Sequence, residues 1–247
     1  MRNIIVLNVI ILLLFSCKKA TDRTCWKGAG ENADTTIFIS EFSKLYLHEN
    51  LEYELVQDSL NCIELQGGKN LLPHIEIQQA SDGTLNIKDL NKCSFLRYNA
   101  SSVKVIIHFK NLTYLTYQGT KQLTNLDTLR LSDFQFFLKD GGGTVNLKLN
   151  ISNTLLGYNT HGAGDFKLGG FAKKATFNIM TLGSCDTRNL NIGNALSIVS
   201  NANAPCYVNA NNTNFKAEVT GQGNIYYSGV PSSIIVHRNG SGDVLPF

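Results

Sequence analysis

Short runs of alternating hydrophobic and polar residues recur along most of the chain. Runs such as Leu45–Leu47, Ile63–Leu65 and Phe215–Ala217 place every second side chain on one face, which is the period of a half-buried strand. Asn, Gly, Ser and Thr, which favour turns and strands, are abundant, whereas strong helix formers are sparse. The pattern predicts an all-β protein.

The second half of the chain contains a repeat of about 21 residues. A small or glycine-rich element recurs in steps of 17 to 22 residues, beginning at Gly119, Gly141, Gly162, Gly183, Ala204, Gly221 and Gly240. Glycine permits positive φ and a close approach of neighbouring turns, so this element is expected to form the corner of each repeat. A unit of this size cannot bury its apolar face alone, but stacked units can.

Hydrophobic residues keep a fixed distance from these corners. Four positions after each starting residue stand Leu123, Val145, Phe166, Thr187, Val208, Ile225 and Val244. Four positions before it stand Leu115, Phe137, Tyr158, Ile179, Ser200, Ala217 and Val236. The columns predict a right-handed parallel β-helix-like solenoid over residues 111–247. An antiparallel sandwich or barrel with regular strand spacing is the alternative.

Residues 25–110 alternate in the same way but lack the 21-residue phase. The pair Asp82–Gly83 stands between two such runs and predicts a tight turn. No linker rich in Pro, Gly or Ser separates the two halves. We therefore expect one continuous body whose first part, residues 25–110, is β-rich and less regular.

The first 16 residues have the features of an export signal. Arg2 precedes an apolar stretch that is too short to span a bilayer. The segment Leu14–Cys17 looks like a lipobox, so we expect cleavage before Cys17, acylation of that residue, and a polar tether over residues 17–24. An ordinary signal peptide with a coincidental cysteine is the alternative. The acyl chains would anchor the protein to the outer membrane, facing the periplasm or the outside.

The charge balance excludes several classes of partner. The 247 residues carry 22 Lys+Arg and 19 Asp+Glu, a net charge of +3, and 43% of them are hydrophobic. Intrinsic disorder and a polybasic nucleic-acid binder are both excluded by these values.

Two of the cysteines occupy equivalent positions of neighbouring repeats. Cys185 and Cys206 each stand two residues after a corner, so stacking would bring their Cα atoms to about 5 Å, within the range of a disulfide. We expect a disulfide between them, because an exported protein meets an oxidising compartment. A pair of small buried thiols is the alternative.

Several segments resemble the head GIN domain family of putative autotransporter adhesins. They follow one another in the family's order: residues 25–30, 67–75, 82–87, 91–98 and 103–107, then Gly221–Pro231 and Gly240–Val244 near the C-terminus. The resemblance implies a solenoid-like domain of the cell envelope, often on lipoproteins, without a known enzymatic activity. It also implies a disulfide between Cys25 and Cys93, which leaves Cys62 as the free thiol; pairing of Cys62 with Cys93 is the alternative.

The sequence contains no recognisable catalytic constellation. It lacks a nucleophile elbow, a zinc-binding helix, a phosphate-binding loop and an EF-hand pattern. Glu52 and Glu54 share a polar strand face, and the acidic or amide residues after the corners are expected to form turns rather than bind calcium; the latter are Asp165, Asp186, Asn224 and Asp243. The five histidines are scattered singly, and we expect neither a metal nor a cofactor.

Two classes of function fit these observations. The first is a non-catalytic, adhesin-like module that binds a glycan or a protein of the envelope or surface, since exposed Tyr and Asn rows offer stacking faces and amides. The second is a polysaccharide hydrolase or lyase on a β-helix scaffold. Association of solenoid ends or edges into a homo-oligomer is a further expectation, because exposed strand edges must be capped or paired.

Overall fold

The computed structural model describes residues 28–91, 103–180 and 182–247, and this part of the chain is almost entirely β-structure. The described residues form eighteen strands, and the only helix among them is a short 3₁₀ turn, Leu72–His74. The first nine strands are β1 (Asn32–Phe38), β2 (Lys44–Glu49), β3 (Glu52–Gln57), β4 (Cys62–Gly68), β5 (Ile75–Gln79), β6 (Thr84–Asp89), β7 (Lys104–Phe109), β8 (Tyr114–Gly119) and β9 (Gln122–Asn125). The remaining nine are β10 (Leu129–Gly141), β11 (Thr144–Gly162), β12 (Asp165–Met180), β13 (Cys185–Ser200), β14 (Cys206–Asn209), β15 (Asn214–Val219), β16 (Ile225–Ser228), β17 (Ser233–Arg238) and β18 (Val244–Pro246).

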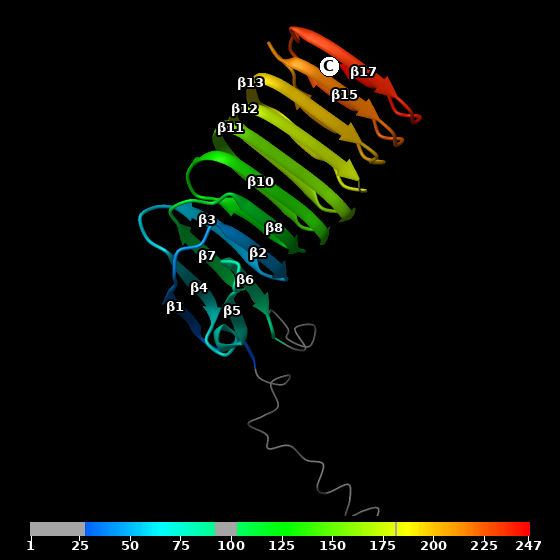
Figure 1. Ribbon diagram of the computed structural model, residues 1–247. Helices are drawn as coiled ribbons and strands as arrows, with labels where there is room; N and C mark the ends of the chain where they lie inside the picture. The colour runs from blue at the N-terminus through cyan, green and yellow to red at the C-terminus, as the bar shows by residue number, and fades with distance from the viewer. Residues whose placement is uncertain (1–27, 92–102, 181) are drawn as a thin grey trace, which may run out of the picture.

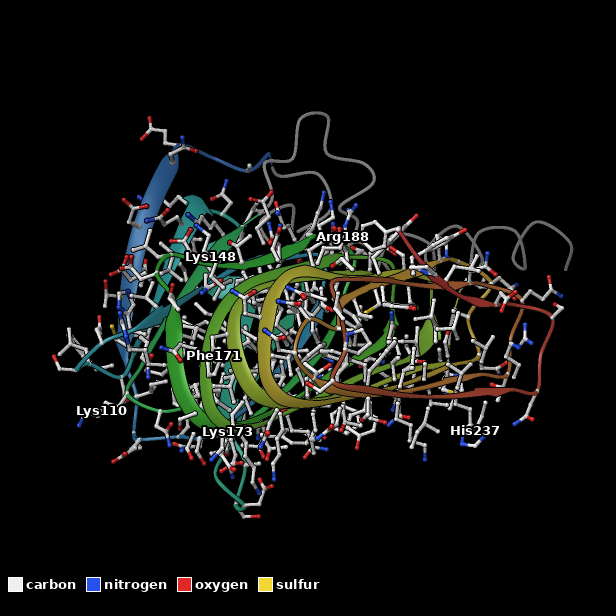
Figure 2. The ribbon with its side chains drawn as sticks, turned by 90° about the horizontal axis from the view of Figure 1, so that it is seen from above. Lys110, Lys148, Phe171, Lys173, Arg188 and His237 are labelled. Atoms are coloured by element: carbon white, nitrogen blue, oxygen red, sulfur yellow. The ribbon has the colours of Figure 1, made fainter. Side chains whose placement is uncertain are left out.

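The strands stack in parallel into a β-solenoid of about six turns, as the repeat predicted (Figure 1). Each turn has two flanks. We call flank A the parallel ladder of β7, β3, β9, the first halves of β11, β12 and β13, and then β14, β16 and β18. Flank B is the ladder of β6, β2, β8, the second halves of β10 to β13, and then β15 and β17. The long strands β11 to β13 curl from one flank to the other through a bend, which Figure 2 shows from above.

The lower turns do not follow the order of the chain. On flank B, β2 lies between β6 and β8; on flank A, β3 lies between β7 and β9. The parallel stack therefore also contains strands that precede residue 111, where the sequence repeat begins. The earliest of these strands is β2, which starts at Lys44. The lack of a 21-residue phase in this part follows from the interleaving, because neighbours in the stack are far apart in sequence.

Antiparallel strands finish the lower end of the stack. On flank A, β4 pairs with β7 and β1 pairs with β4; on flank B, β5 pairs with β6 through a hairpin. The hairpin turn is the predicted one: Gly83 has a φ of 80°, and the carboxylate of Asp82 accepts a hydrogen bond from the amide of Thr84 at 3.0 Å.

The predicted columns exist, but the register that we expected from equal repeats is wrong at several rungs. One core column runs through Val145, Phe166, Cys185, Cys206, Ile225 and Val244, so the cysteines replace the expected Thr187 and Val208. Likewise, Phe137 and Tyr158 align with Asn178, on the outside, rather than with Ile179. Register irregularities in β10, β11 and β12 near the bend change the local spacing without changing the repeat length.

Aromatic rings fill the middle of the core. Phe136 and Phe166 pack edge to face with centroids 5.2 Å apart, and Phe166 lies 5.8 Å from Phe177. Towards the upper end, the small buried residues Cys185, Cys206 and Ala217 are accompanied by the large ring of Phe215. The core therefore contains both large and small side chains along its axis.

The corners require glycine for the reason that the sequence suggested. A Cβ on Gly183 would overlap the carbonyl oxygen of Gly164 in the turn below. Neighbouring turns can approach this closely only where a side chain is missing.

Candidate binding surface

Two side-chain amides take the place of missing strand neighbours where the long strands begin. Asn125, at the end of β9, accepts a hydrogen bond from the amide of Lys148 at 2.9 Å and donates one to its carbonyl oxygen at 2.9 Å. Gln57, at the end of β3, does the same for Arg130, at 2.7 and 2.9 Å. These amides continue the backbone ladder by one residue and fix the position of the strand segment that carries Lys148.

A polar groove of about 470 Å³ lies on flank A directly above that point. Two outer columns line it: Asn146, Lys167 and Asp186 form one, and Lys148, Gly169 and Asn189 form the other. Gly169 lies at the centre of the second column, between Lys148 below and Asn189 above. The groove is hollow because this central position has no side chain.

The two neighbouring glycines have different roles. Gly170 has a φ of 104°, and a Cβ there would overlap the carbonyl oxygen of Leu149, so the backbone needs glycine at this position. A Cβ on Gly169 would meet nothing closer than Asn189, at 3.6 Å. The fold therefore tolerates a side chain at Gly169, and only the hollow depends on its absence.

The groove carries positive charge. Among the described residues, neither Lys148 nor Lys167 has a carboxylate within ion-pair distance. The carboxylate of Asp186 is engaged by Arg188, whose Nη2 lies 2.6 Å from Oδ2, and this hydrogen bond holds the pKa of Asp186 below its usual value. Lys148 and Arg188 lie on the same side of the solenoid, whereas Lys173 lies on the opposite side (Figure 2).

The outward-facing aromatic rings form rows in which neighbouring rings pack against one another, and the rings are half-buried. On flank B, Phe137 and Tyr158 stack with centroids 4.5 Å apart and an interplanar angle of 6°, and Tyr114 lies 5.3 Å below Phe137. On flank A, Tyr207 stacks on Tyr226 at 5.3 Å. Each ring covers one face of its neighbour, so the faces between stacked rings are not available to stack on a sugar.

Other side chains of flank A near the groove make structural contacts. The guanidinium of Arg188 lies 4.8 Å from the ring centroid of Tyr207. Tyr226 and Tyr227 point to opposite faces of β16, because the ring of Tyr227 packs inward at 5.4 Å from Phe215.

The residues after the corners differ from the expected turns, because Asp165 and Asp186 lie at the beginnings of β12 and β13 and only Asn224 and Asp243 lie outside strands. The Oδ1 atom of Asp165 accepts hydrogen bonds from the backbone amide and the hydroxyl of Ser184, at 2.5 and 2.8 Å. Asn224 accepts one from the amide of Asp243 at 2.8 Å. These oxygens are directed at the neighbouring turn, and no cluster of three or more potential metal ligands occurs among the described residues.

One cluster of ionisable side chains escaped the sequence analysis. His108 on β7 bridges two carboxylates: its Nδ1 lies 2.7 Å from Asp58 and its Nε2 lies 3.3 Å from Glu64. Burial favours a higher pKa for the Asp58 carboxyl, but the hydrogen bonds from His108 and from the backbone amide of Leu60, together with the charge of His108, lower that pKa overall. No spacing signal could have shown the cluster, because its members come together only through the pairing of three strands.

The two stacked cysteines lie where the repeat placed them relative to each other. Cys185 and Cys206 are register partners on β13 and β14, and both are fully buried. In the structure they are free thiols rather than the expected disulfide. Burial and a hydrogen bond to Cys206 raise the pKa of the Cys185 thiol well above its usual value. Their oxidation in an exported protein stays a prediction.

The remaining predicted cysteines divide into two groups. Cys62 on β4 is a buried free thiol, and burial raises its pKa. Cys17, Cys25 and Cys93 lie outside the described residues, so lipidation and the bridge between Cys25 and Cys93 stay predictions. In the part of the chain that the structure covers, no helix is long and apolar enough to cross a membrane.

Several solved structures share this fold. A putative adhesin from Bacteroides fragilis superposes with a TM-score of 0.76 at 22% identity, covering 88% of this chain and 97% of that one. A putative adhesin from Parabacteroides distasonis gives 0.62 at 19% identity, covering 89% and 98%. A putative lipid binding protein from the same species gives 0.65 at 18% identity, with the same coverage. No curated protein matches the sequence.

The family comparison covers most of the solenoid. Residues 41–231 match the family described as putative auto-transporter adhesin, head GIN domain. The match includes the interleaved lower turns, the groove on flank A and the cysteine column. The chain belongs to the putative auto-transporter adhesin, head GIN domain family.

Proposed function

We propose that this protein is a non-catalytic, adhesin-like module of the cell envelope that binds a glycan or a protein. In this proposal, acyl chains on Cys17 hold it to the outer membrane, and residues 17–24 tether the solenoid. The described chain begins at the lower end of the stack (Figure 1), so the tether would place that end nearest the membrane. The names of the family and of the structural neighbours support an envelope or surface location.

The observation that carries the proposal is the groove on flank A. Its lining offers amide groups from Asn146 and Asn189 and two ammonium groups without ion-pair partners, Lys148 and Lys167. Amides bond hydroxyls and backbone groups, and ammonium groups bond carboxylates. The groove therefore favours a ligand rich in hydroxyls or amides that also carries acidic groups, and it does not rely on a free aromatic face.

The binding test compares charge reversal on the two flanks. The full chain, purified in detergent, is assayed against polygalacturonate as an acidic polymer, dextran as a neutral polymer, and an array of envelope and surface proteins. Lys148→Glu and Lys167→Glu should each weaken binding roughly 10-fold, because each removes a charge-assisted hydrogen bond. Lys173→Glu makes the same change of net charge on the opposite side and should leave binding unchanged. Equal effects of the three substitutions would contradict a role for the groove.

A second variant tests the hollow itself. Gly169→Val should fill the groove without disturbing the backbone, since nothing lies within 3.4 Å of its Cβ position. Binding should fall while the unfolding temperature stays close to that of the wild type. Retained binding would show that the ligand lies elsewhere.

The enzyme alternative depends on an acid or base that is free to act. The strongest candidate is His108, but both of its ring nitrogens are engaged by Asp58 and Glu64. Incubation with polysaccharides and peptidoglycan should therefore yield no shorter products. Depolymerisation that is lost in Glu64→Gln or Asp58→Asn would replace the binding proposal with a catalytic one.

Lipid anchoring is tested separately. The mass of the membrane-extracted protein should show an acylated N-terminus at Cys17, and Cys17→Ala should release the chain from the membrane. The same processed, membrane-bound product from Cys17→Ala would rule out the anchor without affecting the fold.

A further inference from the structure

The last strand of flank B, β17, is built like a core strand but is exposed. In the turn below, the register partners Phe215 and Ala217 are 2% and 0% exposed. In β17, the corresponding Ile234 and Val236 are 44% and 40% exposed, and the outward-facing Ile235 is 55% exposed. The hydrophobic columns of flank B therefore continue into a strand that no described residue covers.

The backbone edge of β17 is open as well. The amides of Ser233 and Asn239 donate to Thr213 and Val219 of the turn below. Because successive residues of a strand alternate in direction, the N–H and C=O groups of Ile234 and Val236 point away from that turn. An open edge of this kind pairs with another extended strand.

The neighbouring edge on flank A is closed. The backbone amide of Val244 in β18 is bonded to the carboxylate of its neighbour Asp243, at 3.0 Å. Pro246, two residues further along the same edge, has no N–H to offer. The upper end of the solenoid can therefore accept a strand on flank B but offers no amide to one on flank A.

We propose that β17 pairs with β17 of a second copy of this chain, antiparallel and about a two-fold axis. With Ile235 opposite the partner's Ile235, Ile234 lies opposite the partner's Val236, so each open edge receives the complementary donors and acceptors. Residues directly opposite in an antiparallel pair point to the same side of the sheet. The pairing therefore covers the inward-facing Ile234 and Val236 with the same apolar residues of the partner.

The partner's chemistry is set by this self-complementarity. The edge requires a strand with hydrophobic side chains at alternate inward positions, an apolar residue between them and no charge at the centre, which is the sequence of β17 itself. At its end, Arg238 forms an ion pair with Asp243 at 2.8 Å, so the charge is held beyond the central pairs. A two-fold contact of this type is closed and stops at a dimer.

Stacking two copies head to tail, with the upper end of one on the lower end of the other, fits these surfaces less well than the two-fold dimer. The lower end of the stack finishes in β1 and β5, where Asp34 and Glu76 carry charge and the strands run antiparallel to their neighbours. An upper end placed there would meet polar edges instead of apolar columns. The two-fold dimer is therefore the contact that the two ends favour, and it does not depend on the ligand of flank A.

Cysteine cross-linking in the full chain tests this arrangement. Ile235→Cys should form a disulfide-linked dimer on a non-reducing gel of cells that express the protein, because the two residues would face each other across the axis. Lys216→Cys is the matched control: it lies directly below Ile235 on the same outer column and should give no dimer beyond the wild-type background. Equal cross-linking at both positions, or none at Ile235→Cys, would overturn the proposal.

A second variant separates pairing from folding. Val236→Pro removes an N–H that points away from the turn below, so it should abolish the dimer in sedimentation of the detergent-purified chain and leave the unfolding temperature nearly unchanged. Ile235→Pro removes an N–H that points into the stack and should instead lower the unfolding temperature. A dimer that survives Val236→Pro, or a wild-type chain that sediments as a monomer, would refute the pairing. Binding of unrelated extended peptides at the edge of β17, without self-association of the chain, would also refute the pairing.

Discussion

The two ends of the solenoid terminate the stack of strands in different ways. A stack of parallel strands leaves two open edges and an exposed core layer at each end. At the lower end, the antiparallel strands β1, β4 and β5 extend the sheets and finish them with polar side chains. At the upper end, the last turn is an ordinary one, whose hydrophobic columns continue to Ile234 and Val236. The difference shows that repetition builds the middle of such a protein, whereas its ends need separate sequence features.

The largest expected difference in the free energy of unfolding is between a substitution in the core of the middle turns and one in the last turn. Phe166 is fully buried between Phe136 and Phe177, so Phe166→Ala should lower the free energy of unfolding by about 3 to 5 kcal/mol. Ile234→Ala lies in the exposed last strand and should cost the monomer less than about 1 kcal/mol, since much of its surface is already in water. Urea unfolding of both substitutions in the monomeric Val236→Pro background measures this, and equal losses there would show that the last turn is covered even without a partner.

The cysteine column should strengthen the upper turns if it is oxidised. A bridge between Cys185 and Cys206 closes a loop of about 20 residues and would contribute about 3 kcal/mol. We expect the exported protein to lose two hydrogens from the peptide that joins these residues, as measured by mass spectrometry without reduction. The double variant Cys185→Ala/Cys206→Ala should then unfold earlier than the oxidised wild type. Reactivity of both thiols towards an alkylating agent in unfolded, unreduced protein would contradict the bridge.

Tyr117 should make the lower turns sensitive to alkali. Burial raises its pKa to about 12, and its hydroxyl donates a hydrogen bond to the carbonyl oxygen of Lys121 at 2.8 Å. A pKa that is higher in the folded than in the unfolded chain stabilises the fold fully below about pH 10, and the stabilisation is lost as the pH rises to about 12. The loss amounts to about 2 to 3 kcal/mol. Tyr117→Phe should flatten this part of the stability profile, and an unchanged slope would contradict the assignment.

The smallest effect concerns the amides that replace missing strands in the lower half. Asn125→Ala removes both hydrogen bonds to the backbone of Lys148 and should cost about 1 to 2 kcal/mol. Asn211, whose amide oxygen accepts a single bond from the backbone of Val230 in an exposed loop of the upper half, is the control and should matter less. Hydrogen exchange at the Lys148 amide should rise in Asn125→Ala alone.

The sequence predicted the strands and the solenoid because alternation and repetition are local. The register was harder, since irregularities near residues 131–133, 151–154 and 167–174 change the spacing inside a repeat whose length stays nearly constant. The interleaving of β2 and β3 could not be foreseen, because β2 meets β8 about 70 residues away. The groove also escaped, because its centre is Gly169, and a glycine that keeps space open has the same sequence signal as one that makes a turn. The same holds for His108, which meets Asp58 and Glu64 only in the finished fold.

The interleaved lower turns also determine the order in which the strands can pair as the chain is synthesised. Strands β2 and β3 emerge early, but their neighbours on both sides, β6 to β9, emerge up to about 70 residues later. Until then their edges are exposed, and contacts this distant in sequence form slowly. The upper turns, in contrast, can add one by one as each repeat arrives. The first half of the molecule therefore exposes unpaired strand edges for longer during folding than the second half does.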